Sequence, residues 1–213
     1  MTIYSENILF CIAVPLILVI FFIRGNARRF DISFLIGMTV CLLSSYISGF
    51  FGSVSCTDAQ ETAIFISPIV EELMKLLPLL FVFTVFKPDG RQLFLVAAGL
   101  GAGFATFENC CFLLSSRNTS LAFTAVRGLS AGVMHIVCVV VLAISLLIIR
   151  RYEAYSFASV IGATSLSMTF HALYNLLVSA ESAASYIGFA LPLVSAILLY
   201  LPYRKLRDDE KHN

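Results

Sequence analysis

Seven ionisable side chains stand inside long apolar stretches of this 213-residue sequence, where charged groups are rare. They are three glutamates, two histidines, one lysine and one arginine: Glu71, Glu72, Lys75, Glu108, Arg127, His135 and His171. A charge at the centre of a bilayer costs about 2.5–3.5 kcal/mol on insertion scales, so such groups face each other or a wet cavity and usually mark a functional site. The alternative interpretation is a set of structural ion pairs that hold helices together.

The first cluster has the spacing Glu-Glu-x-x-Lys, at Glu71, Glu72 and Lys75. On a helix, residues four apart share a face, so Glu71 and Lys75 are predicted to pair. Glu72 is rotated by about 100° from its neighbour and points elsewhere. A carboxylate is a candidate general base, whereas Lys75 is interpreted as charge compensation.

Three further stretches place polar groups on one face of a helix. The stripes are Gly101, Phe104 and Glu108, followed by Asn109; Gly128, Gly132 and His135, preceded by Arg127; and Thr164, Ser167, His171 and Asn175. Glycines let membrane helices approach closely, which would carry the acidic and imidazole groups inward. Arg127 either joins the site or extends its charged head to the interface.

Seven apolar segments are predicted to position these groups as membrane helices, because a span needs about 20 mostly apolar residues. They cover roughly residues 7–23, 32–53, 62–86, 92–114, 121–149, 154–178 and 183–203. The chain is 59% hydrophobic and 13% charged, which is too apolar for a soluble domain with its usual charge content of about 25%. The runs are continuous rather than alternating, so helices are favoured over a β-barrel. The fold class is therefore all-α, a single polytopic transmembrane domain over residues 1–213 with a catalytic four-helix core at about 62–178.

The basic residues predict the orientation of the bundle. Eleven of the fourteen follow every second helix: Arg24, Arg28, Arg29, Lys87, Arg91, Arg150, Arg151, Arg204, Lys205, Arg207 and Lys211. Because basic loops stay in the cytoplasm, the amino terminus is predicted outside and the carboxyl terminus inside. No basic residue precedes the first segment, so it is interpreted as a retained span rather than a signal peptide.

The depths of the polar groups agree with a common site. Glu71, Glu108 and His171 lie about nine, six and seven residues from the outer ends of their helices, or roughly 9–14 Å deep at about 1.5 Å per residue. His135 lies about fourteen residues in. The groups are therefore predicted to converge in the outer half of the membrane.

These residues resemble the motifs of the PrsW family of intramembrane proteases, relatives of the CAAX-processing and bacteriocin-processing membrane proteases. The matching positions are Glu71, Glu72 and Lys75; Phe104, Glu108 and Asn109; Arg127 and His135; and His171 and Asn175. The motifs follow in order over about half the chain. The resemblance implies an endopeptidase in the plasma or inner membrane that cuts a single-span protein near the outer face. The best-known family role is the first cut in an anti-sigma factor during stress signalling. No nucleic-acid partner is expected.

The residues leave two catalytic arrangements open. The catalytic candidates are Glu71, Glu72, Glu108, His135 and His171, and the supporting ones are Lys75, Phe104, Asn109, Arg127 and Asn175. In the favoured metal-free arrangement one of the adjacent glutamates is the base, the third glutamate or the first histidine orients the water, and the second histidine polarises the carbonyl together with Asn175. In the other, Glu108, His135 and His171 bind zinc, for which two histidines and one carboxylate are a legitimate set, and Glu71 or Glu72 is the base. No His-Glu-x-x-His helix is present to indicate the metal.

Two other function classes share some of these features. A proton-coupled transporter or channel would also bury Glu, His, Arg and Lys. The sequence shows no paired broken helices or internal symmetry of the kind transporters have. A seven-helix receptor or scaffold would not need two histidines and three glutamates at one depth.

Overall fold

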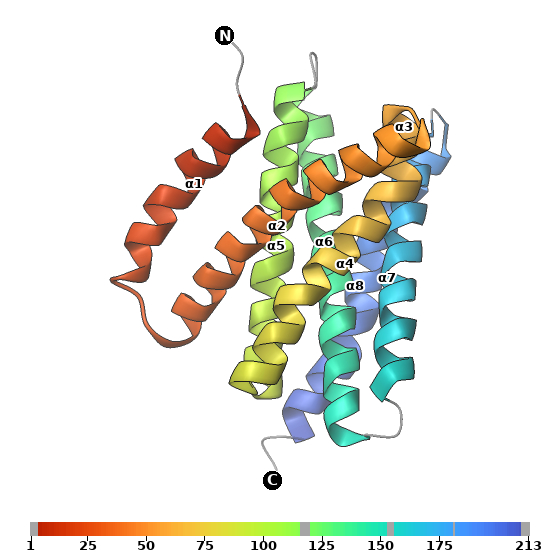
Figure 1. Cartoon of the computed structure of the whole chain (residues 1–213). Coiled ribbons are helices and arrows are strands. Elements are labelled where there is room, and N and C mark those ends of the chain that lie inside the picture. The colour runs from red at the N-terminus through yellow and green to blue at the C-terminus, as the bar shows by residue number, and fades with distance from the viewer. Residues whose placement is uncertain (1–3, 116–119, 153–155, 181, 210–213) are drawn as a thin grey trace.

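Every regular element in the computed structural model is helical over the described residues, 4–115, 120–152, 156–180 and 182–209 (Figure 1). The helices are α1 (Ser5–Ile20), α2 (Gly25–Ser55), α3 (Ala59–Glu61), α4 (Ser67–Phe81), α5 (Gly90–Ser115), α6 (Leu121–Arg151), α7 (Ser156–Val178) and α8 (Ala184–Asp209), with π-helical turns η1 (Thr62–Ile66) and η2 (Val82–Phe86) flanking α4. Since α3, η1, α4 and η2 run on from one another, the described chain has seven helical segments. The predicted all-α bundle is confirmed.

Helices α2, α5 and α6 are the described helices that are long and apolar enough to cross a membrane by themselves. Helix α1 and the Ala184–Tyr200 part of α8 are apolar but shorter. The second helix begins at Gly25 rather than near residue 32, so it also includes Arg28, Arg29 and the buried Asp31. A helix can continue past its apolar stretch because its backbone hydrogen bonds are internal and its basic side chains stay in contact with water.

The third helical segment carries the acidic motif between two irregular turns. Its start is a capping box, in which the Asp58 side chain accepts from the Glu61 backbone and Glu61 reaches back. Pro68 lies in the first turn of α4 and Pro78 lies inside it. A proline donates no backbone hydrogen bond, which disturbs the regular ladder, and π turns of this kind are frequent near functional sites. The segment thus stays helical while its pitch changes on both sides of the motif.

Glycines let α5 pack between α2 and α6 with the backbones almost touching. A Cβ at Gly37 would lie 2.1 Å from the Leu100 carbonyl oxygen, and one at Gly103 would lie 1.9 Å from that of Phe34. On the other face of α5, a Cβ at Gly101 would lie 2.7 Å from a backbone atom of α6. This close approach fixes the position of Glu108, which lies on the same helix.

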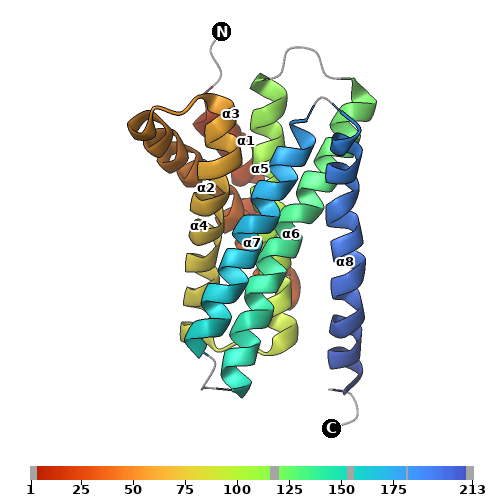
Figure 2. The same ribbon diagram turned by 90° about the vertical axis from the view of Figure 1, so that its right-hand side faces the viewer.

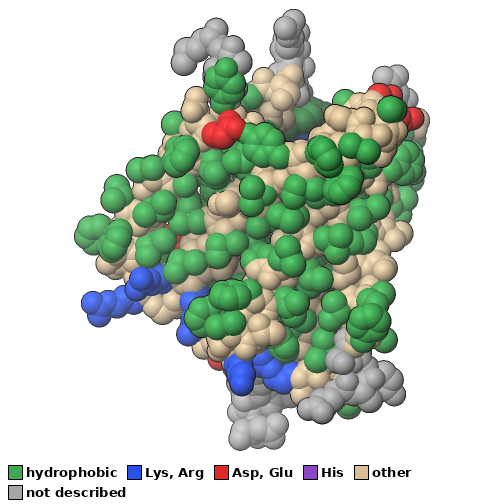
Figure 3. Space-filling view, viewed as in Figure 1, with side chains coloured by type: hydrophobic (Ala, Val, Ile, Leu, Met, Phe, Trp, Pro, Cys, Tyr) green, Lys and Arg blue, Asp and Glu red, His purple; other side chains and the backbone are tan. Residues whose placement is uncertain are grey.

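The remaining helices complete a bundle with two chemically different ends. Helices α4, α7 and α6 lie side by side in Figure 2, and α8 packs on α6 and α7. Hydrophobic side chains cover much of the face in Figure 3, while Lys and Arg gather toward the end where the carboxyl terminus lies and the larger acidic areas lie toward the opposite end. The charge separation matches the one read from the sequence. The orientation in the membrane stays a prediction.

Candidate functional site

The centre of the site is a fully buried ion pair between Glu72 and Lys75. The Lys75 Nζ lies 2.7 Å from the Glu72 Oε1, and neither side chain is exposed. The prediction that Lys75 pairs with Glu71 was therefore wrong, because its partner is Glu72. Positions three apart are also neighbours on a helix, and Glu71 is turned toward α7 instead. Two buried charges need each other, because removing either partner leaves the other unpaired in a low-dielectric interior.

Lys75 also sets the state of the first histidine. Its Nζ lies 2.8 Å from the Nδ1 of His135, which is itself fully buried. An ammonium group can only donate, so Nδ1 accepts and the ring proton lies on Nε2. That Nε2–H donates to the Oε2 of Glu108 on α5. Phe104 packs on both groups, with its ring centroid 4.2 Å from the Lys75 Nζ and 4.7 Å from the His135 ring.

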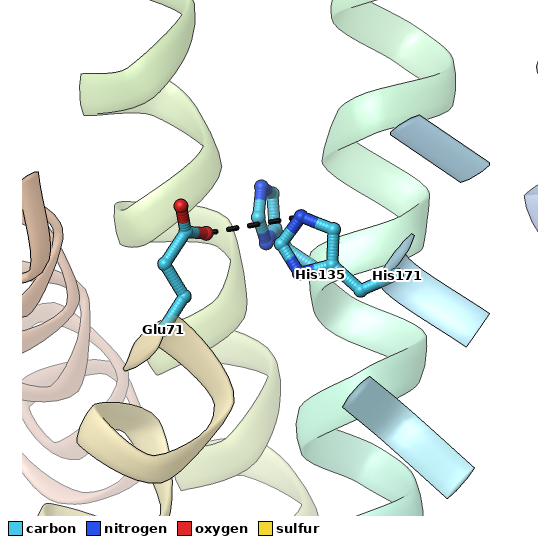
Figure 4. A group of neighbouring side chains, drawn as sticks. All are labelled: Glu71, His135 and His171. Carbon is cyan, nitrogen blue, oxygen red and sulfur yellow. Dashed lines mark ion pairs between the residues drawn. The ribbon is translucent and has the colours of Figure 1, made fainter. Parts of the chain in front are cut away.

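The second histidine contacts both of the adjacent glutamates, and Figure 4 shows its ion pair with Glu71. The His171 Nδ1 lies 2.8 Å from the Glu72 Oε1, and its Nε2 lies 3.8 Å from the Glu71 Oε2. A carboxylate only accepts, so Nδ1–H donates to Glu72 and, in the neutral ring, Nε2 keeps a free lone pair on the side of Glu71. The Glu71 Oε2 is buried and has no hydrogen-bond partner among the residues described. The Glu71 Oε2 and the His171 Nε2 therefore lie close enough to bind one ligand between them.

Arg127 joins the site instead of extending away to the interface. Its guanidinium lies 3.2 Å from the Glu108 Oε1, donates to the Asn109 Oδ1 and stacks 3.6 Å from the Phe112 ring centroid. The Glu108 side chain is 32% exposed and that of Arg127 17%, against 0% for His135. The network therefore opens to its surroundings at Glu108 and Arg127.

The structure thus joins all five catalytic candidates in one network that runs from α7 through α4 and α6 to α5. Of the supporting residues, Lys75, Phe104, Asn109 and Arg127 belong to it. Asn175 does not, because its side-chain amide donates to the Ala63 carbonyl oxygen at 2.9 Å. Asn175 instead ties η1 to α7, and this contact gives no support to its predicted role on the scissile carbonyl.

A second set of contacts joins α6 to α7 beside the network. Tyr174 is buried, and its hydroxyl lies 2.9 Å from the Ser130 Oγ, which in turn donates to the backbone oxygen of Arg127. The Ser167 Oγ donates to the Cys138 carbonyl oxygen at 3.3 Å. The sequence pattern placed Ser167 in the polar stripe of its helix but pointed to neither Ser130 nor Tyr174. The one sequence signal for Tyr174 was that it lies three residues after His171 and so shares a helix face with it.

Three of the side chains are arranged as metal ligands would be. Glu71, His135 and His171 each offer one ligand atom, and these atoms lie within 4.8 Å of one another. Two ligands about 2.1 Å from one zinc ion in tetrahedral geometry are roughly 3.4 Å apart, so modest side-chain rotation would suffice. The unpartnered Glu71 oxygen and the free His171 Nε2 fit such an ion. His171 also has the carboxylate behind its other nitrogen that metal-binding histidines usually have.

A protein-family model agrees with this chemistry. The model described as PrsW family intramembrane metalloprotease matches residues 29–201, which include the whole network. No curated protein and no solved structure matches the chain.

Proposed function

The chain belongs to the PrsW family of intramembrane metalloproteases, and we propose that its buried Glu–His network is the centre at which it hydrolyses a peptide bond of a membrane-anchored substrate. The observation that carries this proposal is the Glu71, His135 and His171 cluster, in which an unpartnered buried carboxylate oxygen faces a free imidazole nitrogen. A purely structural set of ion pairs would satisfy that oxygen, since unsatisfied buried polar atoms are costly.

Glu71, His135 and His171 are the residues that would hold a zinc-class ion. His135 would do so by releasing one of its two ring contacts, to Lys75 or to Glu108, because both of its nitrogens are engaged. When bound there, the ion would supply a Lewis acid for the scissile carbonyl and a more acidic water. From the sequence, a metal-free site was favoured, and Glu108 was the predicted third ligand beside the histidines in the metal-bound alternative. The family description and the unpartnered oxygen of Glu71 instead support the metal-assisted alternative with Glu71 as the carboxylate ligand.

Glu72 and Lys75 are then positioning residues. Glu72 accepts the Nδ1–H of His171 and so presents its Nε2 to the centre. Lys75 balances the charge of Glu72 and holds the His135 ring in place through its Nδ1. Both lie entirely out of contact with solvent, which suits a supporting role rather than contact with substrate.

Glu108 is the group we assign as general base. It is the most exposed of the acids in the network, and it is held from both sides by His135 and Arg127. A base must keep its orientation while it faces the attacking water, and the two contacts and the exposed side chain of Glu108 support this role. Arg127, on the same open side, would donate to the developing oxyanion.

The substrate proposed is a single-span protein cut near the outer face of the plasma or inner membrane, with an anti-sigma factor in a stress response as the specific candidate. This rests on the family resemblance and on the depth of the site. Glu108 lies seven residues before Ser115, the last residue of α5, or about 10 Å from that helix end. This end of α5 lies at the opposite side of the bundle from the basic end.

The test is a cleavage assay with purified protein and tagged single-span substrates. Chelation should abolish cleavage, zinc should restore it, and metal analysis should find one ion per chain that is lost in His171→Ala. Full cleavage by metal-free protein would return the mechanism to a carboxylate-activated water. Full cleavage by both Glu71→Gln and Glu108→Gln would remove the network from catalysis.

A further inference from the structure

A cavity lies apart from the catalytic network, between α5, α6, α8 and the start of α2. Its volume is about 520 Å³, and its walls are almost entirely apolar, including Ala98, Val140 and Leu199. The volume is in the range of small-molecule sites, about 300–1,000 Å³. The groove exists because α8 packs on α6 and α7 and leaves the neighbouring face of α5 uncovered (Figure 2).

The groove is separated from the catalytic network by the contact between α5 and α6. Ile136 lines the groove, while its neighbour His135 is fully buried in the network. Between them the two helices touch backbone to backbone, since a Cβ at Gly101 would lie 2.7 Å from the Ile136 Cα. This helix contact therefore stands between a molecule in the groove and the catalytic network.

The mouth of the groove is polar and lies at the basic end of the molecule. Arg91, Asn26 and Tyr200 line it. Over the described part of the chain, neither Arg91 nor Asn26 has a side-chain hydrogen bond or ion pair. Arg91 is the second residue of α5, so its guanidinium stands where the helix leaves the apolar layer. The mouth thus offers a cation that has no ion-pair partner among the residues described, beside an apolar cleft.

We propose that this groove binds an anionic glycerophospholipid, with the phosphate at Arg91 and one acyl chain against the apolar walls. Guanidinium and phosphate form strong paired hydrogen bonds, and basic pockets between membrane helices are recognised headgroup sites. From Arg91 to Ala98 the groove runs about 10 Å along α5, within a leaflet hydrocarbon depth of about 15 Å. A peptide is a poor occupant, because apolar walls leave its backbone hydrogen bonds unmade.

The test uses the full chain purified in an uncharged detergent. Native mass spectrometry would count retained lipid, and melting temperature would be followed during titration with phosphatidylglycerol, phosphatidylcholine or inorganic phosphate. The variants are Arg91→Gln, which removes the cation, and Ala98→Phe, which fills the groove. Arg28→Gln is the matched control, since Arg28 is another basic-end arginine and is rotated about 200° from Asn26 on α2.

We expect one phosphatidylglycerol per chain and a rise in melting temperature with this lipid alone. Binding should weaken about tenfold in Arg91→Gln, should be lost in Ala98→Phe and should be unchanged in Arg28→Gln. Equal binding of the two lipids, an equal effect of inorganic phosphate, unchanged binding in Ala98→Phe, or a lipid-free dimer covering the groove would each overturn the proposal. If Arg91→Gln does not fold, the lipid preference of the unmodified chain and Ala98→Phe still decide it.

Discussion

Glu108 is the residue at which the proposed chemistry is most directly tested. In Glu108→Gln the amide oxygen still accepts from the His135 Nε2–H, so the protein should fold with little change in melting temperature. Loss of the base should lower the cleavage rate by about 100- to 10,000-fold. The control is Glu61→Gln, which keeps a capping box at the start of α3 because glutamine also serves there. A Glu108→Gln variant within a few-fold of full activity would refute this assignment.

Lys75 should act on stability before it acts on catalysis. Lys75→Met leaves the buried Glu72 carboxylate without its partner, and breaking a buried pair costs about 3–5 kcal/mol. Membrane abundance and melting temperature should therefore fall sharply. Adding Glu72→Gln should recover much of both, because no unpaired charge remains, while cleavage stays low since His171 loses its orienting carboxylate. If the second change brings no recovery, the two side chains do not stabilise the fold as a pair.

At this scale the sequence predicted the members of the site better than their contacts. Charged and imidazole side chains in apolar helices have few alternatives to meeting each other, so Glu71, Glu72 and His171 could be identified from type and position alone. The partner of Lys75 could not, because three- and four-residue separations are both neighbouring on a helix. The contact of Asn175 with the Ala63 carbonyl depends on where η1 passes, which no local pattern encodes.

The helix that carries Glu108 depends on glycines for its place in the bundle. A Cβ at Gly103 would lie 1.9 Å from a backbone oxygen of α2, and a backbone atom cannot rotate away. Gly103→Ala should therefore force α2 and α5 apart and destabilise the protein by about 1–3 kcal/mol or more. Gly132→Ala on α6 is the control, since nothing lies within 4 Å of its new Cβ. Thermal unfolding in detergent would compare them, and equal melting temperatures would contradict the close packing described.

The helices themselves were predictable because a long apolar run in a membrane protein has helix as its ordinary solution. The glycine stripe of α5 also indicated close packing. The π turns η1 and η2 were not predicted, because an insertion of one residue into a turn leaves the apolar pattern almost unchanged. The early start of α2 was missed for a related reason, since Arg28 and Arg29 reduce hydropathy without breaking a helix.

Over the whole molecule, the two proposed sites lie toward opposite ends of the bundle. The catalytic network opens at Glu108 and Arg127, toward the end of α5. The lipid groove opens at Arg91, near the start of the same helix. If the basic end faces the cytoplasm, the peptide bond is cut near the outer face and the lipid is taken from the inner leaflet. Orientation therefore links both proposals.

That orientation can be tested with reporter fusions, because the positive-inside rule makes a definite prediction for each loop. A fusion after Asn118, between α5 and α6 and outside the described residues, should read as exterior. A fusion after Arg204, in the basic stretch at the end of α8, should read as cytoplasmic. The lone arginine near the first point is Arg117, whereas Arg204, Lys205, Arg207 and Lys211 cluster at the second. Adding three lysines beside Asn118 should weaken the exterior signal, since loop charge rather than helix sequence sets the orientation. The same reading from both fusions of the unmodified chain would contradict the three spans predicted between them, and a reversal of both would place the cut at the cytoplasmic face.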